Sequence, residues 1–299
     1  MSPPPGKPSA RRGGVNRARH SILRSRWTWL TPAASALRKR RSLVLAYHGI
    51  AESSAAVDPE FLRVAPEVFR GQLDVLLGAG FEVVTVAELA RRAAGRTPPP
   101  GLVALSFDDG MDDNHSILLP ILQAYGLPAT VYVTTGLIGK PNPWMKLGAS
   151  RMMTEGELRD LVAAGVELGA HTVTHPNLEE LDYDSCLREM VESRDLLAEL
   201  TGQPVRTFAY PFCMYGEAAV RAARAARFDA AVTCLDRGSW APFEMRRVMI
   251  TGKDGPASFA LKLAELYGPL FHSRAGQLAR VSTRGARSRG RALLERRKR

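Results

Sequence analysis

The amino-acid sequence predicts an α/β domain built on a parallel β-sheet. Short apolar runs alternate along the chain with segments of helical periodicity, and no long block of successive strands interrupts this alternation. Repeated strand–helix units of this kind favour a parallel barrel or a doubly wound sheet. A chain of 299 residues, 45% hydrophobic and 24% charged, is long enough to bury the core of one such domain of about 200 to 250 residues.

Eight short runs predict the strands. Each has four to six residues and is almost continuously hydrophobic, which is typical of strands that are covered on both faces. In chain order the runs are 43–47, 81–85, 102–107, 129–133, 166–170, 206–210, 229–233 and 247–250.

Three segments between the strands show helical patterns most clearly. Thr154 followed by Glu157 is a capping box, which marks the start of one of them. A glycine stands near the end of each segment, where a helix is expected to stop. The segments are 66–80, 154–165 and 183–202, with Gly80, Gly165 and Gly202 near their ends.

Both ends of the chain are basic. Residues 1–42 hold eleven Lys or Arg and no acid, and residues 273–299 hold ten with one acid, so the segment between them is acidic although the whole chain has a formal charge of +11. We therefore expect a basic, disordered or peripheral leader over 1–41, one domain over 42–268 and a basic, disordered tail over 269–299. No nucleic-acid partner is expected for the domain, and no glycine-rich phosphate-binding loop is present.

The leader contains two tryptophans, Trp27 and Trp29, together with Ile22 and Leu30 among many cations. A disordered leader, or a cap on the underside of the barrel, is the plainer interpretation. The alternative is peripheral attachment to an anionic membrane, where tryptophans sit at the headgroup level and each cation contributes about 1 kcal/mol. Pro32 would confine any helix here to one side of it.

The sequence has no apolar run long enough to span a membrane, and its start lacks the apolar centre of a secretory signal. A cytoplasmic location is therefore expected, with the inner membrane surface as a variant of it. The three cysteines, Cys186, Cys213 and Cys234, are too few and too scattered for a disulfide framework or a metal knuckle. They are expected to be small, reduced core residues.

Polar side chains follow three of the predicted strands. These are His48, the pair Asp108 and Asp109, and His171 with His175 four residues further on. Taken alone, two aspartates before a glycine predict a turn with a helix N-cap, and a single histidine is usually structural. In a parallel barrel, however, the carboxyl ends of the strands converge on one face, and that face carries the chemistry. The coincidence therefore favours a functional site.

The spacing of His171 and His175 predicts a metal site. The pair resembles the HExxH pattern of zinc helices, but Thr172 stands where the glutamate would be and the preceding run is a strand, so a site in a turn at a strand end is expected. Two imidazoles and one carboxylate favour Zn²⁺, and Co²⁺, Ni²⁺, Fe²⁺ and Mn²⁺ suit the same ligand types. One of Asp108 and Asp109 would be the third ligand and the other would remain free as a base.

Over residues 43–265 the chain resembles the polysaccharide deacetylases, the NodB-homology carbohydrate esterases. The resemblance rests on "YHGI" (47–50), "LSFDDG" (105–110) with "DN" (113–114), "LPATVYVTTGLIG" (127–139), "LGAHTVTHPNL" (168–178) and "FAYPF" (208–212). It implies a deformed (β/α) barrel of about seven parallel strands. It also implies a metal-dependent hydrolase that removes N-acetyl groups from N-acetylglucosamine-type sugars and leaves acetate and a free amino sugar.

The resemblance also implies roles for individual residues. Asp109, His171 and His175 are similar to the metal ligands of the family, and Asp108 to its catalytic base. The backbone N–H of Phe212 would stabilise the oxyanion. The neighbouring residues with substrate-binding or supporting roles are Tyr210 and Pro211.

The chain departs from the family pattern in three places. Ala209 stands where many members have an arginine beside the catalytic base, and Arg247 is our hypothesis for a replacement guanidinium. Cys213 replaces a common glycine and would leave a thiol near the metal. The usual C-terminal Leu-x-His strand that supplies the acid is imitated only by "LFH", which ends at His272. The subgroup that this chain most resembles takes its acid from the first strand, which favours His48.

Two other function classes stay open at this point. One is a metal-dependent hydrolase of another amide, such as a formamido sugar or a small cyclic amide, which acetate and formate assays would separate from a deacetylase. The other is a catalytically inactive carbohydrate-binding protein, which the presence of every ligand and of the base disfavours. The expected partner is an N-acetylated carbohydrate.

Overall fold

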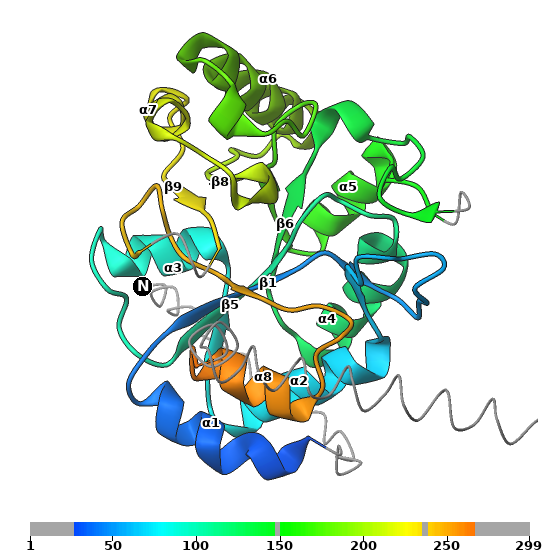
Figure 1. Cartoon of the computed structure of the whole chain (residues 1–299), viewed down its shortest axis with the longest axis vertical. Helices are drawn as coiled ribbons and strands as arrows, with labels where there is room; N and C mark the ends of the chain where they lie inside the picture. Colours follow the sequence, from blue (N-terminus) through cyan, green and yellow to red (C-terminus); the bar gives the residue numbers. More distant parts are fainter. Residues whose placement is uncertain (1–26, 147–149, 235–238, 267–299) are drawn as a thin grey trace, which may run out of the picture.

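The centre of the protein is a curled β-sheet in which all neighbouring strands run parallel (Figure 1). This computed structural model describes residues 27–146, 150–234 and 239–266. The strand order is β10-β1-β5-β6-β7-β8-β9, and β4 pairs with the first half of β5. All eight predicted strands are confirmed, as β1 Leu43–Tyr47, β4 Glu82–Val84, β5 Leu102–Phe107, β6 Thr130–Val133, β7 Glu167–Ala170, β8 Thr207–Ala209, β9 Ala230–Val232 and β10 Val248–Met249.

The two ends of the strand order approach one another. Met245, which precedes β10, forms a parallel bridge with Val232 of β9. The amide N–H of Thr233 also donates to the carbonyl of Met245 at 2.8 Å. The sheet therefore curls almost into a ring, and the predicted deformed (β/α) barrel is confirmed.

Helices cover the strands where the predicted periodicity placed them, and further helices fill the remaining connections. Thr154 and Glu157 form the predicted capping box at the start of α5. The predicted segments correspond to α2, α5 and α6. The helices are α1 Thr31–Arg38, α2 Pro66–Gly78, α3 Val86–Ala93, α4 Leu119–Tyr125, α5 Glu155–Ala163, α6 Tyr183–Thr201, α7 Glu217–Ala225 and α8 Pro256–Leu263.

The period-2 alternation of the strands divides the core into two layers. Along β5, Val103, Leu105 and Phe107 join the large core beneath most of the helices. Leu102 and Ala104 face the concave side, where they pack with residues of α3. Since the concave side is partly filled by α3, the space left inside the curl lies toward the carboxyl ends of the strands.

Small residues make room for larger ones inside the curl. Gly169 of β7 lies against the ring of Tyr132, and a β-carbon at residue 169 would come within 2.3 Å of that ring. Ala104 and Ala209 face the same side. The interior can therefore hold Tyr132 and, beside it, the buried side chain of Arg247.

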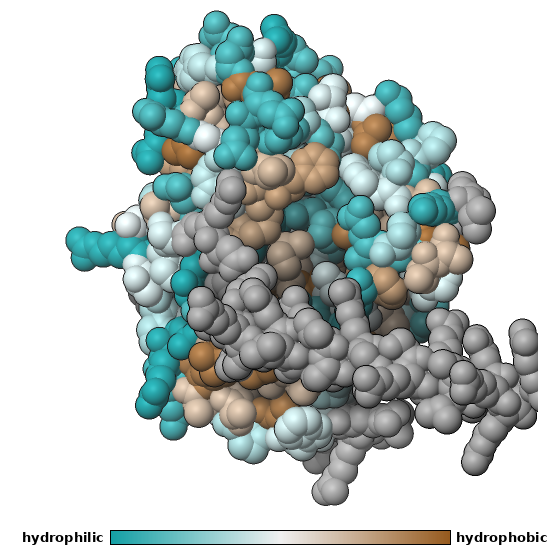
Figure 2. Space-filling model, in the orientation of Figure 1, coloured by the Kyte–Doolittle hydropathy of each residue, from teal (hydrophilic) through white to brown (hydrophobic). Residues whose placement is uncertain are grey.

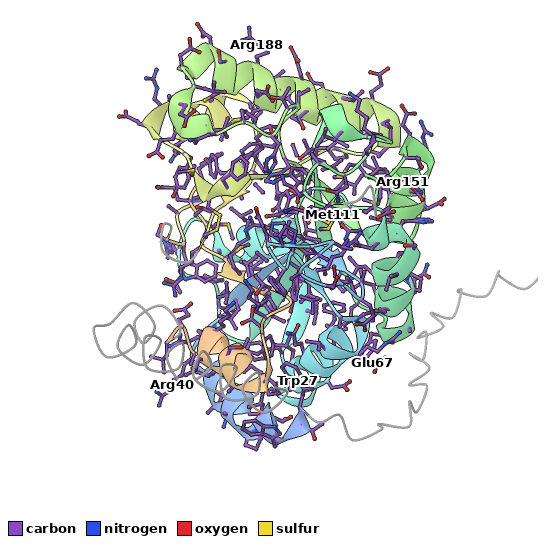
Figure 3. The ribbon with its side chains drawn as sticks, turned by 45° about the vertical axis from the view of Figure 1, so that its right-hand side comes forward. Trp27, Arg40, Glu67, Met111, Arg151 and Arg188 are labelled. Atoms are coloured by element: carbon purple, nitrogen blue, oxygen red, sulfur yellow. A yellow bond between two sulfur atoms is a disulfide. The ribbon has the colours of Figure 1, made fainter. Side chains whose placement is uncertain are left out.

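The structure corrects the predicted start of the domain. Residues Thr28–Leu30 and α1 are helical. Trp27, labelled in Figure 3, packs edge-to-face on Phe259 of α8, and their ring centroids are 5.7 Å apart. Trp27 and Leu30 are buried, and Trp27 closely contacts Gly71 of α2. The disorder expected through residue 41 is thus wrong for residues 27–41. These residues are ordered because their apolar side chains are buried against α2 and α8, which follow later in the chain. The segment therefore corresponds to the cap on the underside of the barrel, the alternative to a disordered leader.

The same burial weakens the membrane interpretation of this segment. Of the apolar residues on which that interpretation rested, Trp27 and Leu30 are in the core, and Trp29 is 65% exposed. Ile22 lies outside the described residues, as do the tail from residue 269 and His272. None of the helices that the structure describes is long and apolar enough to cross a membrane.

The surface in Figure 2 is uneven in character. The upper part, over α6 and α7, is largely hydrophilic, whereas apolar side chains gather around a hollow near the centre of this face.

Candidate active site

The strand alternation directs Asp108 and His171 into the curl, and Asp109 leaves the strand conformation with a φ of 75°. Asp108 follows β5 and continues the inward positions of that strand, and His171 continues the inward position of Gly169 in β7. Asp108 is 4% exposed and His171 is 2% exposed, so both residues are buried in the interior. The carboxyl ends of β5 and β7 therefore bring Asp108, Asp109 and His171 together, as the sequence predicted.

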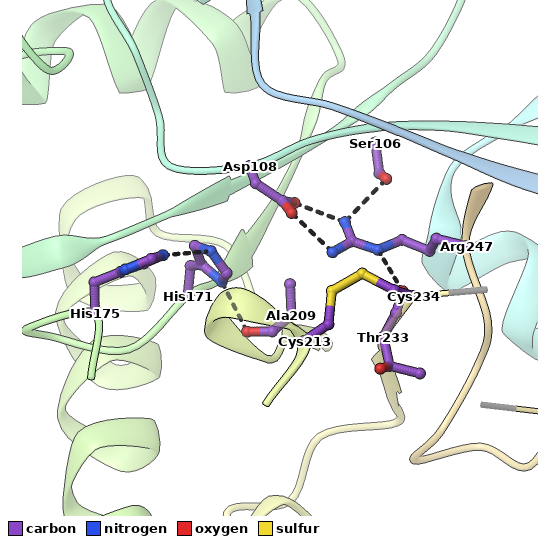
Figure 4. The surroundings of a disulfide bond; sticks show 9 residues. All are labelled: Ser106, Asp108, His171, His175, Ala209, Cys213, Thr233, Cys234 and Arg247. Atoms are coloured by element: carbon purple, nitrogen blue, oxygen red, sulfur yellow. Dashed lines mark hydrogen bonds and ion pairs between the residues drawn. A yellow bond between two sulfur atoms is a disulfide. The ribbon is translucent and has the colours of Figure 1, made fainter. Parts of the chain in front are cut away.

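Asp109, His171 and His175 form one cluster of potential metal ligands. Oδ1 of Asp109 lies 3.5 Å from Nε2 of His171 and 3.5 Å from Nε2 of His175. The two Nε2 atoms are 3.2 Å apart (Figure 4). All three ligand atoms lie within 4.8 Å of one another. Three converging nitrogen and oxygen atoms are the donor set that a catalytic zinc site uses, with a coordination position left for a substrate.

The second ring nitrogen of His171 shows how this histidine is oriented. Nδ1 lies 2.8 Å from the carbonyl oxygen of Ala209. A carbonyl can only accept a hydrogen bond, so a proton is on Nδ1, and Nε2 is the nitrogen that faces the cluster. Metal-ligating histidines are held in this way. The residues present therefore fit a divalent metal.

The electrostatics favour the metal-binding forms of Asp109 and His175. Burial would lower the pKa of His171, but the hydrogen bond with Asp109 and the charges of Asp108 and Asp109 raise it, so a metal would displace a proton from this imidazole. Burial alone would raise the pKa of Asp109, but the hydrogen bond with His171 and the neighbouring imidazoles of His48, His171 and His175 hold it below its usual value. Burial and the neighbouring His171 lower the pKa of His175 to about 4. At neutral pH Asp109 is thus an anion and His175 a neutral imidazole, the forms that bind a metal.

Arg247 lies against Asp108 in the interior of the curl. Its Nη1 and Nη2 donate to the two carboxylate oxygens at 2.6 and 2.7 Å, and the arginine is fully buried (Figure 4). Nη1 also donates to Ser106 at 3.2 Å, and Nε donates to the carbonyl of Thr233 at 3.0 Å. Burial would raise the pKa of Asp108, but Arg247, with His171 and His48, holds it well below its usual range. Asp108 is therefore ionised and fixed in orientation.

Backbone conformations that L-residues rarely adopt are concentrated in this site. Of nine non-glycine residues with positive φ in the described chain, five lie in its loops. Such conformations persist only where the surroundings enforce them, and they cluster at functional sites. The five are Asp109 (φ 75°), Thr172 (66°), His175 (59°), Phe212 (54°) and Cys213 (57°).

The "FAYPF" segment contributes one exposed ring and a supporting tyrosine. Phe212, in the turn η6 Pro211–Cys213, is 58% exposed and lies edge-on to His175 at 4.5 Å. Trp144 contacts the same imidazole at 4.8 Å. Tyr210 instead faces the outer core, where its hydroxyl donates to the carbonyl of Phe243 at 3.0 Å. The structure therefore gives Tyr210 and the buried Pro211 a packing position and brings Phe212 to the rim.

His48 follows β1 and is held through its backbone. Nδ2 of Asn114 donates to the His48 carbonyl at 2.9 Å. Asp113 accepts from the amide of Ile50 at 3.0 Å and from Arg63 at 2.7 Å, which anchors β2 Gly49–Ile50 after the histidine. His48 also contributes to the lowered pKa of Asp108, so it lies near the site. Asp113 and Asn114, the "DN" of the sequence motif, thus support this strand end, a role that their sequence positions alone did not indicate.

The structure corrects the expectation for two of the cysteines. Cys213 and Cys234 form a disulfide, whereas Cys186 is free and buried as predicted (Figure 4). Cys213 and Cys234 are 21 positions apart in the sequence, but they follow β8 and β9, which are neighbours in the sheet. The bond ties η6 to the end of β9, directly after Thr233, which accepts the hydrogen bond from Arg247.

Comparison with known proteins gives a consistent result. Residues 95–231 match the family model described as polysaccharide deacetylase. YxkH of Bacillus subtilis, whose name places it with the polysaccharide deacetylases, is 27% identical over 191 residues, which are 64% of this chain and 63% of YxkH. This chain thus spans less than two thirds of that relative. A poly-β-1,6-N-acetyl-D-glucosamine N-deacetylase of Escherichia coli is 31% identical over 88 residues, which are 29% of this chain and 13% of that enzyme.

Solved structures share the fold. The Streptococcus pyogenes deacetylase PplD, determined in complex with acetate, superposes with a TM-score of 0.63 at 26% identity and covers 75% of this chain and 98% of its own. IcaB from Ammonifex degensii superposes with a TM-score of 0.62 at 25% identity and covers 76% of this chain and 97% of its own.

The disulfide yields a test of the corrected assignment. Replacing Cys213 and Cys234 together with serine should lower the free energy of unfolding by about 3 kcal/mol, because the bond restricts the unfolded chain. Urea unfolding of the two proteins measures this. Wild-type protein with a phosphine reductant should behave like the double variant, and Cys186→Ala should remain sensitive to reductant. Identical unfolding of the wild type with and without reductant would show that the two cysteines are not bonded.

Proposed function

We propose, from the match of residues 95–231 to the polysaccharide deacetylase family model, that the protein is a metal-dependent hydrolase of the N-acetyl groups of N-acetylglucosamine-type sugars. Its products would be acetate and a free amino sugar. The observation that carries the proposal is the cluster of Asp109, His171 and His175 beside an ionised, unligated Asp108. These are the parts that hydrolysis of an acetamide requires.

Asp109, His171 and His175 would hold the metal. Their two neutral nitrogens and one carboxylate favour Zn²⁺, with Co²⁺, Ni²⁺, Fe²⁺ and Mn²⁺ as other ions that suit the ligands. A divalent ion bound there would polarise the acetamide carbonyl and lower the pKa of water toward about 7.

Asp108 would accept the proton of the attacking water. Its carboxylate is not one of the three metal-ligand groups, and Arg247 holds both of its oxygens in a fixed direction. The same ion pair that keeps Asp108 charged also makes it a weak base, so its contribution comes from position more than from basicity. The Phe212 N–H would donate to the oxygen of the tetrahedral intermediate, a contribution of about 3 to 4 kcal/mol for a preorganised donor.

His48 would donate a proton to the departing amine. It continues the inward positions of β1 and lies within electrostatic reach of Asp108 and Asp109. An amine leaves as a neutral group only when it is protonated, so an acetamide needs an acid at this position. The backbone contacts of Asn114 and Asp113 support His48 in this role.

The rim of the site supports a carbohydrate substrate. Phe212 and Trp144 present aromatic rings on two sides of His175. Aromatic rings offer rigid apolar surface on which the apolar face of a pyranose can pack. The name of the related Escherichia coli enzyme specifies poly-N-acetylglucosamine, and we extend to this chain only the N-acetylglucosamine unit as the substrate class.

The first test separates the metal ligands from the base. Alanine at Asp109, His171 or His175 should lower bound metal and acetate release together, because three protein ligands leave none in reserve. Asp108→Asn should retain the metal and lower turnover by about 10² to 10⁴-fold, because an amide cannot accept the proton. Metal content and acetate release from an N-acetylglucosamine oligomer measure the two effects, and a formate assay separates deacetylation from deformylation. An Asp108→Asn enzyme with full amidase activity would rule out this mechanism.

The second test concerns the acid. His48→Ala should keep its metal, and should lose far more activity on an N-acetylglucosamine oligomer than on phenyl acetate, because a phenolate leaves without protonation. The matched control is His272→Ala, which should behave as the wild type on both substrates. An active His48→Ala beside an inactive His272→Ala would transfer the acid role to His272 and leave the metal chemistry unchanged.

A further inference from the structure

The loop that joins His171 to His175 is held by a carboxylate that the catalytic scheme does not use. On α6, Oε2 of Glu189 accepts hydrogen bonds from the backbone N–H of Val173 at 2.8 Å and of Thr174 at 2.9 Å. Its Oε1 accepts from the hydroxyl of Thr174 at 2.7 Å. Two successive N–H groups that converge on one charged oxygen fix the orientation of the peptide between them.

The opposite side of the loop rests on the backbone of η3 Thr135–Leu137. The amide of Gly136 donates to the Val173 carbonyl at 2.8 Å, and the amide of Thr135 donates to the Thr172 carbonyl at 3.1 Å. A β-carbon at residue 136 would come within 2.4 Å of the Val173 oxygen. The loop therefore lies between the η3 backbone and Glu189, and contacts on both sides limit its position.

This loop needs such support because its own conformation is unfavourable. Thr172 and His175 both have positive φ, at 66° and 59°. Inside the loop, the amide of His175 donates to the Thr172 hydroxyl at 3.0 Å. Without external contacts, residues with β-carbons would leave the left-handed region. That relaxation would move His175 relative to His171.

We propose that Glu189 is a positioning residue for the metal site, which sets the distance between the imidazoles of His171 and His175. It would not touch metal or substrate. Its contacts go to two of the three residues between the ligands, so their loss would act on both ligands at once. The proposal rests on the proposed function, since it assumes that this triad binds a metal.

The test uses Co²⁺ as the probe and the visible absorption of the bound ion as the readout. Glu189→Met keeps the length of the side chain and removes both acceptors. It should raise the dissociation constant for Co²⁺ about ten-fold, the lower end for groups that orient metal ligands, and alter the ligand-field bands. Glu189→Gln should stay within about two-fold of the wild type, because its amide oxygen can still accept from both N–H groups.

Glu192, exposed and three positions further along α6, provides the matched control. Glu192→Met should bind Co²⁺ with the affinity and spectrum of the wild type. If Glu189→Met does not fold, Glu189→Asp, whose carboxylate is one methylene short of the loop, should show the same weakening and the same spectral change.

The outcomes separate the two hypotheses. A folded Glu189→Met variant with the Co²⁺ affinity and spectrum of the wild type would overturn the positioning role and leave the proposed enzyme intact. A Glu189→Gln variant as weak as Glu189→Met would also overturn it, because the amide oxygen retains the acceptor. Wild-type protein that binds no Co²⁺ would overturn the metal site itself.

Discussion

The candidate site depends on one buried ion pair, that of Arg247 with Asp108. A charged group inside a protein is tolerated only when it is paired and its remaining hydrogen-bonding atoms are satisfied. Here the guanidinium donates to both oxygens of Asp108, to Ser106 and to the Thr233 carbonyl. It thereby joins the end of β5, the end of β9 and the start of β10. The pair keeps the proposed base ionised and also connects the strands where the curl nearly closes.

The ion pair also explains how the chain accommodates Ala209. Where related chains are expected to carry an arginine at this position, the small side chain of Ala209 leaves interior space, and its carbonyl accepts the hydrogen bond from His171. The guanidinium comes instead from Arg247, directly before β10, and also donates to the Thr233 carbonyl after β9, the neighbour of β8. The disulfide of Cys213 with Cys234 joins the segments that follow β8 and β9. The proposed base, oxyanion donor and metal ligand are thus held by contacts among neighbouring strand ends.

The strands and the main residues of the candidate site could be predicted because the hydrophobic pattern of a strand is contained in a few consecutive residues. The apolar runs predicted all eight strands, and the rule that parallel strands end at one edge placed Asp108, Asp109, His171 and His175 in one predicted site. Other features depend on packing between distant segments. Trp27 is buried because α8 lies beside it, and Cys213 meets Cys234 because β8 and β9 are neighbours. Glu189 has no local signal either, since its role follows from how α6 lies on the loop after β7.

A double-mutant cycle on metal-free protein tests the central claim most directly, with urea unfolding of the wild type, Arg247→Met, Asp108→Asn and the combined variant. If the pair holds the site together, Arg247→Met should cost about 3 to 5 kcal/mol because it leaves a buried carboxylate unpaired. The combined variant should then be more stable than Arg247→Met alone, with a coupling energy of about 2 kcal/mol or more. If the destabilisation of the combined variant equals the sum of the two single effects to within about 0.5 kcal/mol, the account is contradicted.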